Sequence, residues 1–375
     1  ALGAYHLART TLAMLDEHGA FARVAVDEPA VVRAAALLHD LGHYPFSHAL
    51  EEIGVPHHEV VARPLLTEGP VAEVLRREVA PDAPERVWRL VCGEGDSPLR
   101  GLISGSLDLD KIEYLRRDAH MCGVPYGQID VDRLLVNLVV ADLPDGTRAV
   151  ALREKGLSAL ESLLFAKYQM YRNVYWHHAV RSATAMYKRL VDDALRAGAF
   201  GFAAAEAAPL AAHTDEGLLH ELAQRAPSPL LGALRGRRLY KRLLECPAAE
   251  LGDGEGDWIA EDRPLVVAVE DALAREVGLA PGELLLDYPA KTQMLGLDLP
   301  VLRRGGAVER LTEAGWEGAI NLPRLAEQLY RSARWLRVFA VRRVAVDATA
   351  LTAALRRPPE ALRAALAEGR PLLVH

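Results

Sequence analysis

Histidines and a carboxylate gather in one short stretch near the beginning of the chain. Five of the thirteen histidines fall between residues 39 and 58, where the sequence opens HDLGHYPFSH. An apolar segment with helical spacing, VVRAAALL (31–38), leads into this stretch, which predicts a buried helix that ends at His39 and Asp40. These two adjacent side chains can bind one metal ion if the helix end is slightly irregular. His39 and His43, four residues apart, would lie on one helical face.

A second acidic segment follows, and a single helix is expected over 106–122. On such a helix Asp110, Tyr114, Arg117 and Asp118 project to nearly one side. That face offers a carboxylate ligand beside an aromatic ring and a cation. Imidazole and carboxylate together suit Mn, Fe, Co, Ni or Zn better than Mg alone. The sequence therefore predicts a divalent transition metal as the cofactor, and Mg could accompany the substrate.

A third segment combines cations with tyrosines. Long helices are expected over 157–197, and on one helix Lys167, Tyr171, Tyr175 and His178 would follow a single face. Cations beside aromatic rings suit the phosphates and the sugar or base of a nucleotide. The three segments together favour phosphate chemistry at a metal ion.

The composition sets limits on partners and location. The chain has 375 residues and a formal net charge of −7, so it has no general attraction for nucleic acid. Three scattered cysteines form neither a disulfide framework nor a paired-cysteine zinc site, which indicates a reducing cytoplasm. No apolar run is long enough to cross a membrane. Polyphosphate binding would need a local basic cluster, such as Arg235, Arg237, Arg238, Lys241 and Arg242.

The elements that must position these residues are mostly helices. We expect a mainly α fold, with a helical domain over 1–250 and a smaller α+β region over 251–375, after the acidic loop GDGEGD. The other helices are expected at 7–15, 30–38, 325–331 and 348–366. A hairpin is expected over 141–151, around a Pro-Asp-Gly turn, and strands at 264–269, 283–288 and 335–345.

Two of these strings resemble the motifs of one enzyme family. HDLGHYPFSH (39–48) is close to the central motif of the HD-domain deoxynucleoside triphosphate triphosphohydrolases, and DLDKIEYLRRDAHMCGV (108–124) resembles the segment that supplies that family's last metal-binding aspartate. YRNVYWHHAV (171–180) falls where the family has a phosphate-contacting helix. Weaker similarity, which extends the resemblance over most of the chain, lies at 237–244, 287–292 and 325–331. The resemblance implies a helical HD-domain core.

The resemblance also assigns roles to individual residues. The implied metal ligands are His39, Asp40 and Asp110. The implied active-site histidines are His43, His48 and His58. The implied substrate contacts are Lys111, Tyr114 and Asp118 with phosphate and sugar, Lys167 with the distal phosphates, and Tyr175 along the sugar or base. Glu51 falls where the family often has an aspartate that orients a catalytic histidine.

Several of these residues also have an ordinary structural interpretation. Tyr114 and Tyr175 could be core aromatics, and Lys111 and Lys167 could be solvated helix lysines. Glu51 could be a surface glutamate. The basic cluster at 235–242 fits nucleotide or nucleic-acid binding and a solvated helix face equally well.

One departure from the family concerns the first metal ligand. The family's first metal-binding histidine opens a string such as His-x-Leu-Gly-x-Tyr-His, whereas this sequence begins ALGAYH, which places that ligand immediately before Ala1. Either the sequence as given omits it or the site lacks it. A site made only of His39, Asp40 and Asp110 would bind metal more weakly.

Quaternary structure and regulation are implied by the resemblance alone. Relatives assemble as dimers or larger rings, often with a nucleotide at subunit contacts. We therefore expect a homo-oligomer and a regulatory nucleotide. Lys291 resembles a position that contacts such nucleotides in some relatives, and a surface lysine is its alternative.

Three functions remain open at this point. The first is hydrolysis of a dNTP at the α-phosphorus to a deoxynucleoside and inorganic triphosphate, with His48 or His58 protonating the leaving 5′ oxygen. The resemblance alone implies that Tyr114, packed against the sugar, would favour deoxyribose. The second is an HD phosphohydrolase or phosphodiesterase acting on other nucleotides or oligonucleotides. The third is a nucleotide sensor or nucleic-acid-binding module without catalysis.

Overall fold

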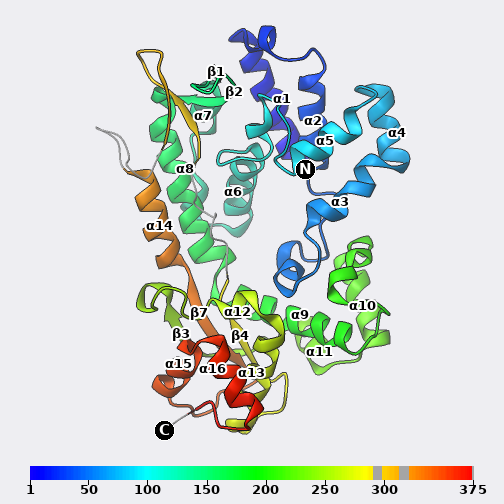
Figure 1. The fold of residues 1–375 in the computed structure, drawn as a ribbon, viewed down its shortest axis with the longest axis vertical. Helices are drawn as coiled ribbons and strands as arrows, with labels where there is room; N and C mark the ends of the chain where they lie inside the picture. Colours follow the sequence, from blue (N-terminus) through cyan, green and yellow to red (C-terminus); the bar gives the residue numbers. More distant parts are fainter. Residues whose placement is uncertain (290–297, 312–320, 374–375) are drawn as a thin grey trace. The chain divides into compact units, whose positions relative to one another are not determined.

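The computed structural model describes residues 1–289, 298–311 and 321–373. Figure 1 labels its α-helices and the strands β1, β2, β3, β4 and β7. These residues form two compact units, each assembled from three stretches of the chain: unit 1 from 1–43, 57–170 and 293–329, and unit 2 from 44–56, 171–292 and 330–375. The domain boundary expected at residue 250 stays a prediction. Lys291 lies outside the described residues.

Unit 1 is a helical assembly with a small sheet. Its helices are α1 (Leu2–Glu17), α2 (Glu28–Leu38), α3 (His58–Thr67), α4 (Gly69–Glu78), α5 (Ala83–Val91), α6 (Leu109–Cys122), α7 (Val131–Val136) and α8 (Leu157–Met170). Its strands are β1 (Leu138–Asp142), β2 (Arg148–Arg153), β5 (Pro300–Leu302) and β6 (Val308–Arg310). The sheet order is β1-β2-β5-β6, with β2 parallel to β5 and the other pairs antiparallel. The expected hairpin over 141–151 is present as β1 and β2.

The core of unit 1 holds α2 in place. The buried residues Val31, Val32 and Ala35 of α2 recur on one face at helical spacing. α2 packs against α1 and α5. α6 packs against α1 as well. The packing brings the carboxyl end of α2 and the amino end of α6 to one place, so the sequence pattern of these helices positions their polar ends.

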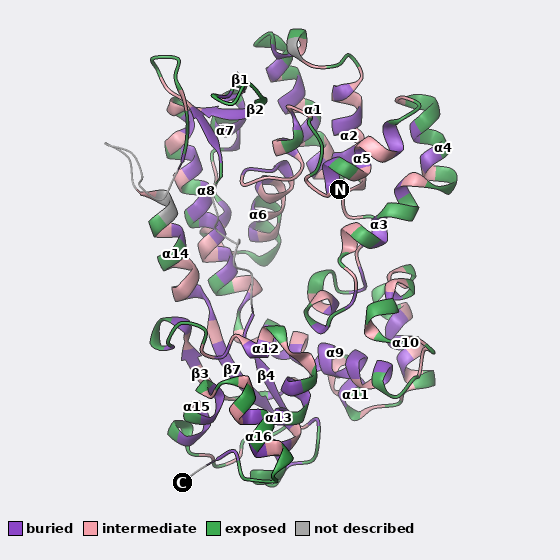
Figure 2. Ribbon diagram, viewed as in Figure 1, coloured by how far each residue is buried: buried purple, intermediate pink, exposed green. Residues whose placement is uncertain are grey.

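Unit 2 combines a buried helix with a three-stranded sheet. Its helices are α9 (His178–Arg196), α10 (Asp215–Arg225), α11 (Pro229–Arg235), α12 (Trp258–Glu261), α13 (Arg263–Glu276), α15 (Ala348–Arg356) and α16 (Pro359–Ala367). The strands β3 (Lys241–Pro247), β7 (Trp335–Ala340) and β4 (Leu284–Asp287) lie in that order, all antiparallel. α14 (Leu322–Ala333) has its first residues in unit 1 and its last in unit 2. Figure 2 shows β4 and β7 buried almost throughout.

The mainly α fold with a smaller sheet region in the carboxyl-terminal part is confirmed. The helices expected at 325–331 and 348–366 are present, and the strands expected at 283–288 and 335–345 correspond to β4 and β7. Among the described residues, none of the helices combines the length and apolar character that crossing a bilayer requires.

The strand expected at 264–269 is wrong, because this stretch begins the helix α13. Its valines favour a strand by propensity. Asp262, however, caps the helix by accepting a hydrogen bond from the Leu265 backbone N–H, and Pro264 lies in the first turn, where its missing N–H costs nothing. The start signal and the helical spacing of buried residues outweigh the β-branched composition.

The single helical face expected for Lys167, Tyr171, Tyr175 and His178 is also wrong. α8 ends at Met170, the residues Tyr171–Tyr175 form a π-helical turn, and α9 begins at His178. A π turn winds more residues per turn than an α-helix, so it shifts every later side chain around the axis. The four residues therefore do not follow one stripe.

Candidate active site

The carboxyl end of α2 presents His39 to two carboxylates. α2 ends at Leu38, and His39 to Gly42 form turns, so the irregular helix end required for ligation by two adjacent side chains is present. The Nδ1 atom of His39 lies 3.0 Å from the backbone oxygen of Ala36, which directs Nε2 the other way. Nε2 lies 3.1 Å from Oδ1 of Asp40 and 3.3 Å from Oδ1 of Asp110.

Asp110 reaches this place from the first turn of α6. The helix starts at a strong cap, because the Asp108 carboxylate accepts a hydrogen bond of 2.8 Å from the backbone N–H of Lys111. The buried Ile112 and Leu115 fix the helix in the core. Two sequence segments some 70 residues apart thereby supply one group of ligand atoms, one from each of three side chains, all within 4.8 Å of one another.

The electrostatics of this group fit a cation. Nε2 of His39 is buried and has no hydrogen-bond partner of good geometry in the part of the chain that the structure describes. Burial alone would lower the pKa of His39, but the facing carboxylates of Asp110 and Asp40 outweigh it and raise that pKa. Burial would raise the pKa of Asp110, and His39 outweighs this effect and lowers it. A divalent ion in place of the histidine proton would satisfy all three side chains.

Two further histidines lie beside this group within unit 1. The rings of His43 and His58 have centroids 4.3 Å apart, and Nδ1 of His43 lies 3.5 Å from Oδ1 of Asp40. Gly42 permits this approach, because a Cβ there would lie 2.1 Å from the backbone oxygen of His58. His58 itself opens α3, with Glu59 3.4 Å from its Nδ1. His43 lies beyond the end of α2, so a tight turn rather than a shared helical face places it near Asp40.

The other predicted histidine belongs to unit 2. His48 begins the short 3-10 helix η2 (His48–Ile53), and its Nδ1 lies 3.3 Å from Oε2 of Glu51. Glu51 thus contacts a histidine, as the resemblance implies.

Two predicted substrate residues on α6, Lys111 and Asp118, form hydrogen bonds with residues in or next to that helix. Lys111 donates from Nζ to the backbone oxygen of Gly105 and to Oδ2 of Asp108, each at 2.6 Å. Asp118 accepts from Arg117 at 2.9 Å, and Tyr114 is half-buried. Lys111 therefore stabilises the start of α6, and a role toward phosphate would require it to leave these partners.

The remaining two predicted substrate residues lie in different units. Lys167 is buried in α8 of unit 1, with 7% of its surface exposed. Tyr175 lies in the π turn of unit 2, where its ring packs edge-on against Tyr171 with centroids 5.1 Å apart. The described structure does not test their roles.

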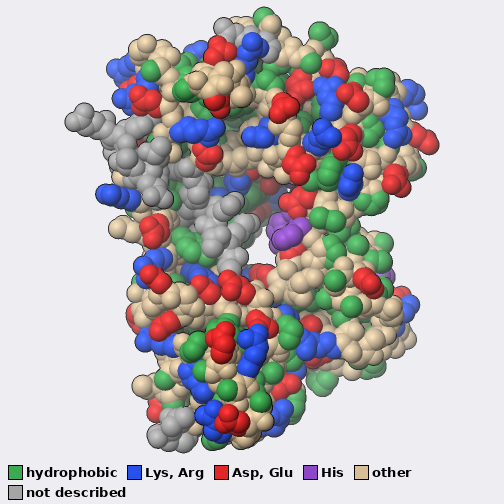
Figure 3. Space-filling model, in the orientation of Figure 1, with side chains coloured by type: hydrophobic (Ala, Val, Ile, Leu, Met, Phe, Trp, Pro, Cys, Tyr) green, Lys and Arg blue, Asp and Glu red, His purple; other side chains and the backbone are tan. Residues whose placement is uncertain are grey.

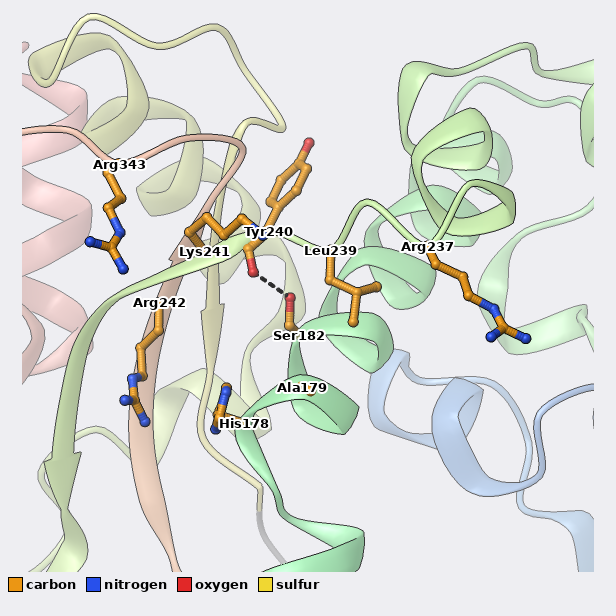
Figure 4. A pocket seen from close by; sticks show the side chains of 9 residues that line it. All are labelled: His178, Ala179, Ser182, Arg237, Leu239, Tyr240, Lys241, Arg242 and Arg343. Atoms are coloured by element: carbon orange, nitrogen blue, oxygen red, sulfur yellow. Dashed lines mark hydrogen bonds between the residues drawn. The ribbon is translucent and has the colours of Figure 1, made fainter.

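A basic pocket of about 390 Å³ lies in unit 2, and sequence reasoning found it only in part. Its lining residues are His178, Ala179, Ser182, Arg237, Leu239, Tyr240, Lys241, Arg242 and Arg343. Figure 4 shows Arg242, Arg343 and His178 on one side and Arg237 on the other. Burial and the charges of neighbouring cations lower the pKa of His178.

The basic cluster at 235–242 does not form a helical face. α11 ends at Arg235 and β3 begins at Lys241, with Arg237 at positive φ between them. On the face drawn in Figure 3, Lys and Arg side chains are interspersed with Asp and Glu. On that face no broad field of one sign develops, so anion binding would depend on local groups.

Sequence reasoning missed a cluster of charges in unit 2, in which Arg181, Lys188 and Asp287 are buried and Glu52 lies at the exposed edge. Arg181 and Lys188 of α9 contact Glu52 of η2 and Asp287 of β4. The Asp287 side chain is fully buried, and Arg181 is 6% exposed. No local spacing pattern marks this cluster, because Glu52 lies 129 residues and Asp287 lies 106 residues from Arg181 along the chain.

The segment that contains the histidine and aspartate group matches a known family model. Residues 3–114 match the model of the HD domain. The chain carries an HD domain. Residues 129–315 match the HD-associated region. His39, Asp40 and Asp110 all lie within the matched HD domain, as do His43, His48 and His58.

This HD-domain chain is similar to parts of several longer proteins. An uncharacterized Bacillus subtilis protein is 35% identical over 162 residues, 43% of this chain and 36% of its own. An uncharacterized Methanocaldococcus jannaschii protein is 31% identical over 250 residues, 66% of this chain and 51% of its own. A Dictyostelium discoideum protein named as a homologue of a deoxynucleoside triphosphate triphosphohydrolase is 27% identical over 200 residues, 50% of this chain and 38% of its own. The chain thus spans between about a third and a half of these relatives.

Solved structures share the fold over most of the chain. A Bacteroides thetaiotaomicron protein described as a phosphohydrolase is 22% identical, with a TM-score of 0.64 over 91% of this chain and 86% of its own. A hypothetical protein from Aquifex aeolicus is 25% identical, with a TM-score of 0.65 over 90% of this chain and 82% of its own.

Proposed function

We propose that this chain is a metal-dependent phosphohydrolase that cleaves dNTPs to a deoxynucleoside and inorganic triphosphate. The observation that carries the proposal is the convergence of His39, Asp40 and Asp110 on one point within the matched HD domain. The names of the Dictyostelium relative and of the Bacteroides phosphohydrolase support the reaction class. The dNTP substrate rests further on the resemblance of the segments 39–48 and 108–124.

The chemistry follows from the donor set. A bound divalent ion would supply Lewis-acid activation of water and of a phosphate oxygen. Hydrolysis breaks the bond between the α-phosphorus and the 5′ oxygen, the oxygen of water stays on the triphosphate, and a proton goes to the 5′ oxygen. His48 would deliver this proton from Nε2, because Glu51 lies at Nδ1 and holds the ring. His58 is the alternative donor, with Glu59 at its Nδ1.

Other residues of the chain would bind the substrate. Lys167, and Lys111 once released from Asp108, would neutralise phosphate charge. Tyr114 would pack against the sugar, Tyr175 would lie along the sugar or base, and Asp118 would contact the sugar. The homo-oligomer and the regulatory nucleotide remain expectations, and the basic pocket offers four cations to an anionic ligand: Arg237, Lys241, Arg242 and Arg343.

Product analysis tests the proposal. The Mn-loaded protein is offered each dNTP alone and then all four together, and the products are separated by ion-exchange chromatography. Deoxynucleoside with intact triphosphate, lost in Asp40→Ala and retained in the exposed Asp132→Asn control, is the expected result. Release of a monophosphate, or shortening of an oligonucleotide offered in a parallel reaction, would indicate an HD enzyme with another substrate. A metal-loaded protein without turnover on any of these substrates would contradict the proposal and favour a sensor.

A further inference from the structure

The residues just before His48 are held by two helices of unit 2. The His48 loop, residues 44–56, is one of the three stretches of chain that make up unit 2. The buried Tyr187 of α9 donates its hydroxyl to the backbone oxygen of Pro45 at 3.1 Å. The backbone N–H of Phe46 donates to Oδ1 of Asp215 on α10 at 2.9 Å, and the Phe46 ring packs against Tyr187. The residues before His48 are therefore bound to two helices.

The backbone directly before His48 is strained. Phe46 has a φ of 60° and Ser47 a φ of 61°, both in the region that favours glycine. Side-chain-bearing residues remain there only where surrounding contacts fix them, and such strain collects at functional sites. The strain requires an anchor downstream of His48 as well as upstream.

Glu52 is that downstream anchor. Its Oε1 accepts from Nη1 of Arg181 at 3.1 Å, and its Oε2 accepts from Nη2 of Arg181 at 2.9 Å and from Nζ of Lys188 at 2.7 Å. The fork of Arg181 fixes the plane of the carboxylate, which a single contact would not do. Both oxygens of Glu52 are occupied by cations, whereas an oxygen of its neighbour Glu51 lies at the His48 ring.

The cations that hold Glu52 are themselves fixed. Arg181 also donates from Nε to Oδ2 of Asp287 at 2.9 Å, and Asp287 is fully buried in β4. Lys188 is 9% exposed and lies 3.8 Å from the same aspartate. Two cations and two anions balance, so removal of either anion leaves the buried Arg181 and Lys188 with a single carboxylate. The cluster is therefore a rigid support for the loop.

We propose that Glu52 is a positioning residue that fixes His48 and Glu51 in their working geometry through Arg181 and Lys188. The inference rests on the proposed function for the role of His48, and adds a residue to which neither the family resemblance nor the comparisons assign a role. Glu52 lies four residues after His48 on η2, within the same short helix, so a shift of its carboxylate moves the His48 backbone directly.

The test compares Glu52→Gln with a matched control in the full chain. The glutamine keeps the shape and removes the charge. We expect kcat for dNTP hydrolysis to fall by roughly 10- to 100-fold with little change in KM, because a small misplacement of a proton donor costs that much. Amide hydrogen exchange within residues 45–53 should rise at the same time. The control is Asp192→Asn, a buried acid of α9 that pairs with Arg196 and Arg263, both of which lie outside the loop.

Asp192→Asn should lower stability while leaving kcat and the exchange of the loop unchanged. If Glu52→Gln does not fold, Lys188→Met removes one of the two cations and should produce the same pair of changes at smaller size. A folded Glu52→Gln variant with wild-type kcat, or with lost activity but unchanged loop exchange, would overturn the proposal. Absence of activity in the wild-type protein would refute the proposed function, and the exchange measurement would still decide whether Glu52 anchors the loop.

Discussion

The candidate metal group of unit 1 (His39, Asp40 and Asp110) and the charged cluster of unit 2 (Glu52, Arg181, Lys188 and Asp287) use ionisable side chains in opposite ways. In unit 1, two half-buried aspartates and one histidine converge with an excess of negative charge, and the histidine nitrogen that faces them is buried without a well-aligned partner. In unit 2, the four charges balance, and every anion faces a cation. The first arrangement favours the binding of a cation, whereas in the second each charge is already paired within the protein.

The difference shows how one class of residue serves binding in one place and rigidity in another. A group of charges that do not balance is stabilised only when a ligand of opposite charge binds. A group of paired charges contributes by fixing the geometry of the surrounding structure. The fold loses most stability when one member of such a group is removed. Mutations should therefore separate the two regions: one set should remove the metal ion with little effect on stability, and the other should lower stability without removing the metal ion.

The largest effect is expected from the metal group. Asp110→Ala should lower kcat/KM by roughly a thousandfold or more, because several kcal/mol of charge stabilisation would disappear with the ion. The free energy of unfolding of the metal-free protein should change little, since the mutation also relieves crowded negative charge. Initial-rate kinetics and urea denaturation measure the two quantities. An Asp110→Ala variant that is less stable but keeps wild-type activity per folded molecule would contradict this distinction between the two regions.

The second effect is expected from the charged cluster. Asp287→Asn should destabilise the protein by about 3–5 kcal/mol, because Arg181 and Lys188 then share one carboxylate in a buried place. The number of metal ions bound by the folded protein should not change. Chemical denaturation with metal analysis of the folded fraction checks both statements. A loss of metal without a loss of stability would be the contrary result.

The third prediction concerns the turn between His39 and His43. Gly42→Ala would place a Cβ 2.1 Å from the backbone oxygen of His58 and 2.6 Å from the nitrogen of Ala62. The backbone must shift, which should cost about 1–3 kcal/mol and weaken metal binding together. Gly54→Ala is a useful comparison, because its Cβ would meet no atom within 4 Å, although its positive φ also adds strain. Metal affinity unchanged by Gly42→Ala would show that this turn does not set the site.

The smallest effect is a pH dependence in the charged cluster. Burial alone would raise the pKa of Glu52, but Arg181 and Lys188 outweigh it and hold that pKa well below the ordinary value of 4.5. A carboxyl group with a lowered folded-state pKa stabilises the fold above its unfolded pKa and loses this contribution as the pH falls. The stability difference between wild type and Glu52→Gln should stay constant above pH 4.5 and shrink below it. A difference that grows on acidification would contradict this assignment.

The sequence predicted that His39, Asp40 and Asp110 would lie together, and it could do so because the information is local. The strings at 39–48 and 108–124 each place their residues within a few positions, at a helix end and in a first helical turn. The helices α2 and α6 and the hairpin of β1 and β2 were predicted for the same reason. Periodicity and turn residues are short-range signals.

The rest could not be predicted because it depends on distant partners or on small backbone changes. Glu52 and Arg181 are 129 residues apart, and Arg181 and Asp287 are 106 apart. No spacing rule connects them. The π turn at 171–175 inserts into a helical pattern without a proline or glycine to mark it, and the valines of α13 favoured a strand that the cap at Asp262 overrules.

The metal content of wild type and Asp110→Asn tests the central claim most directly. Both proteins would be stripped with chelator, loaded with Mn, dialysed and analysed for metal by elemental mass spectrometry. The account predicts close to one ion per chain in the wild type and a large loss in the variant, which keeps the shape of the side chain and removes its charge. Equal metal content in two folded proteins would contradict the assignment of His39, Asp40 and Asp110 as one metal site.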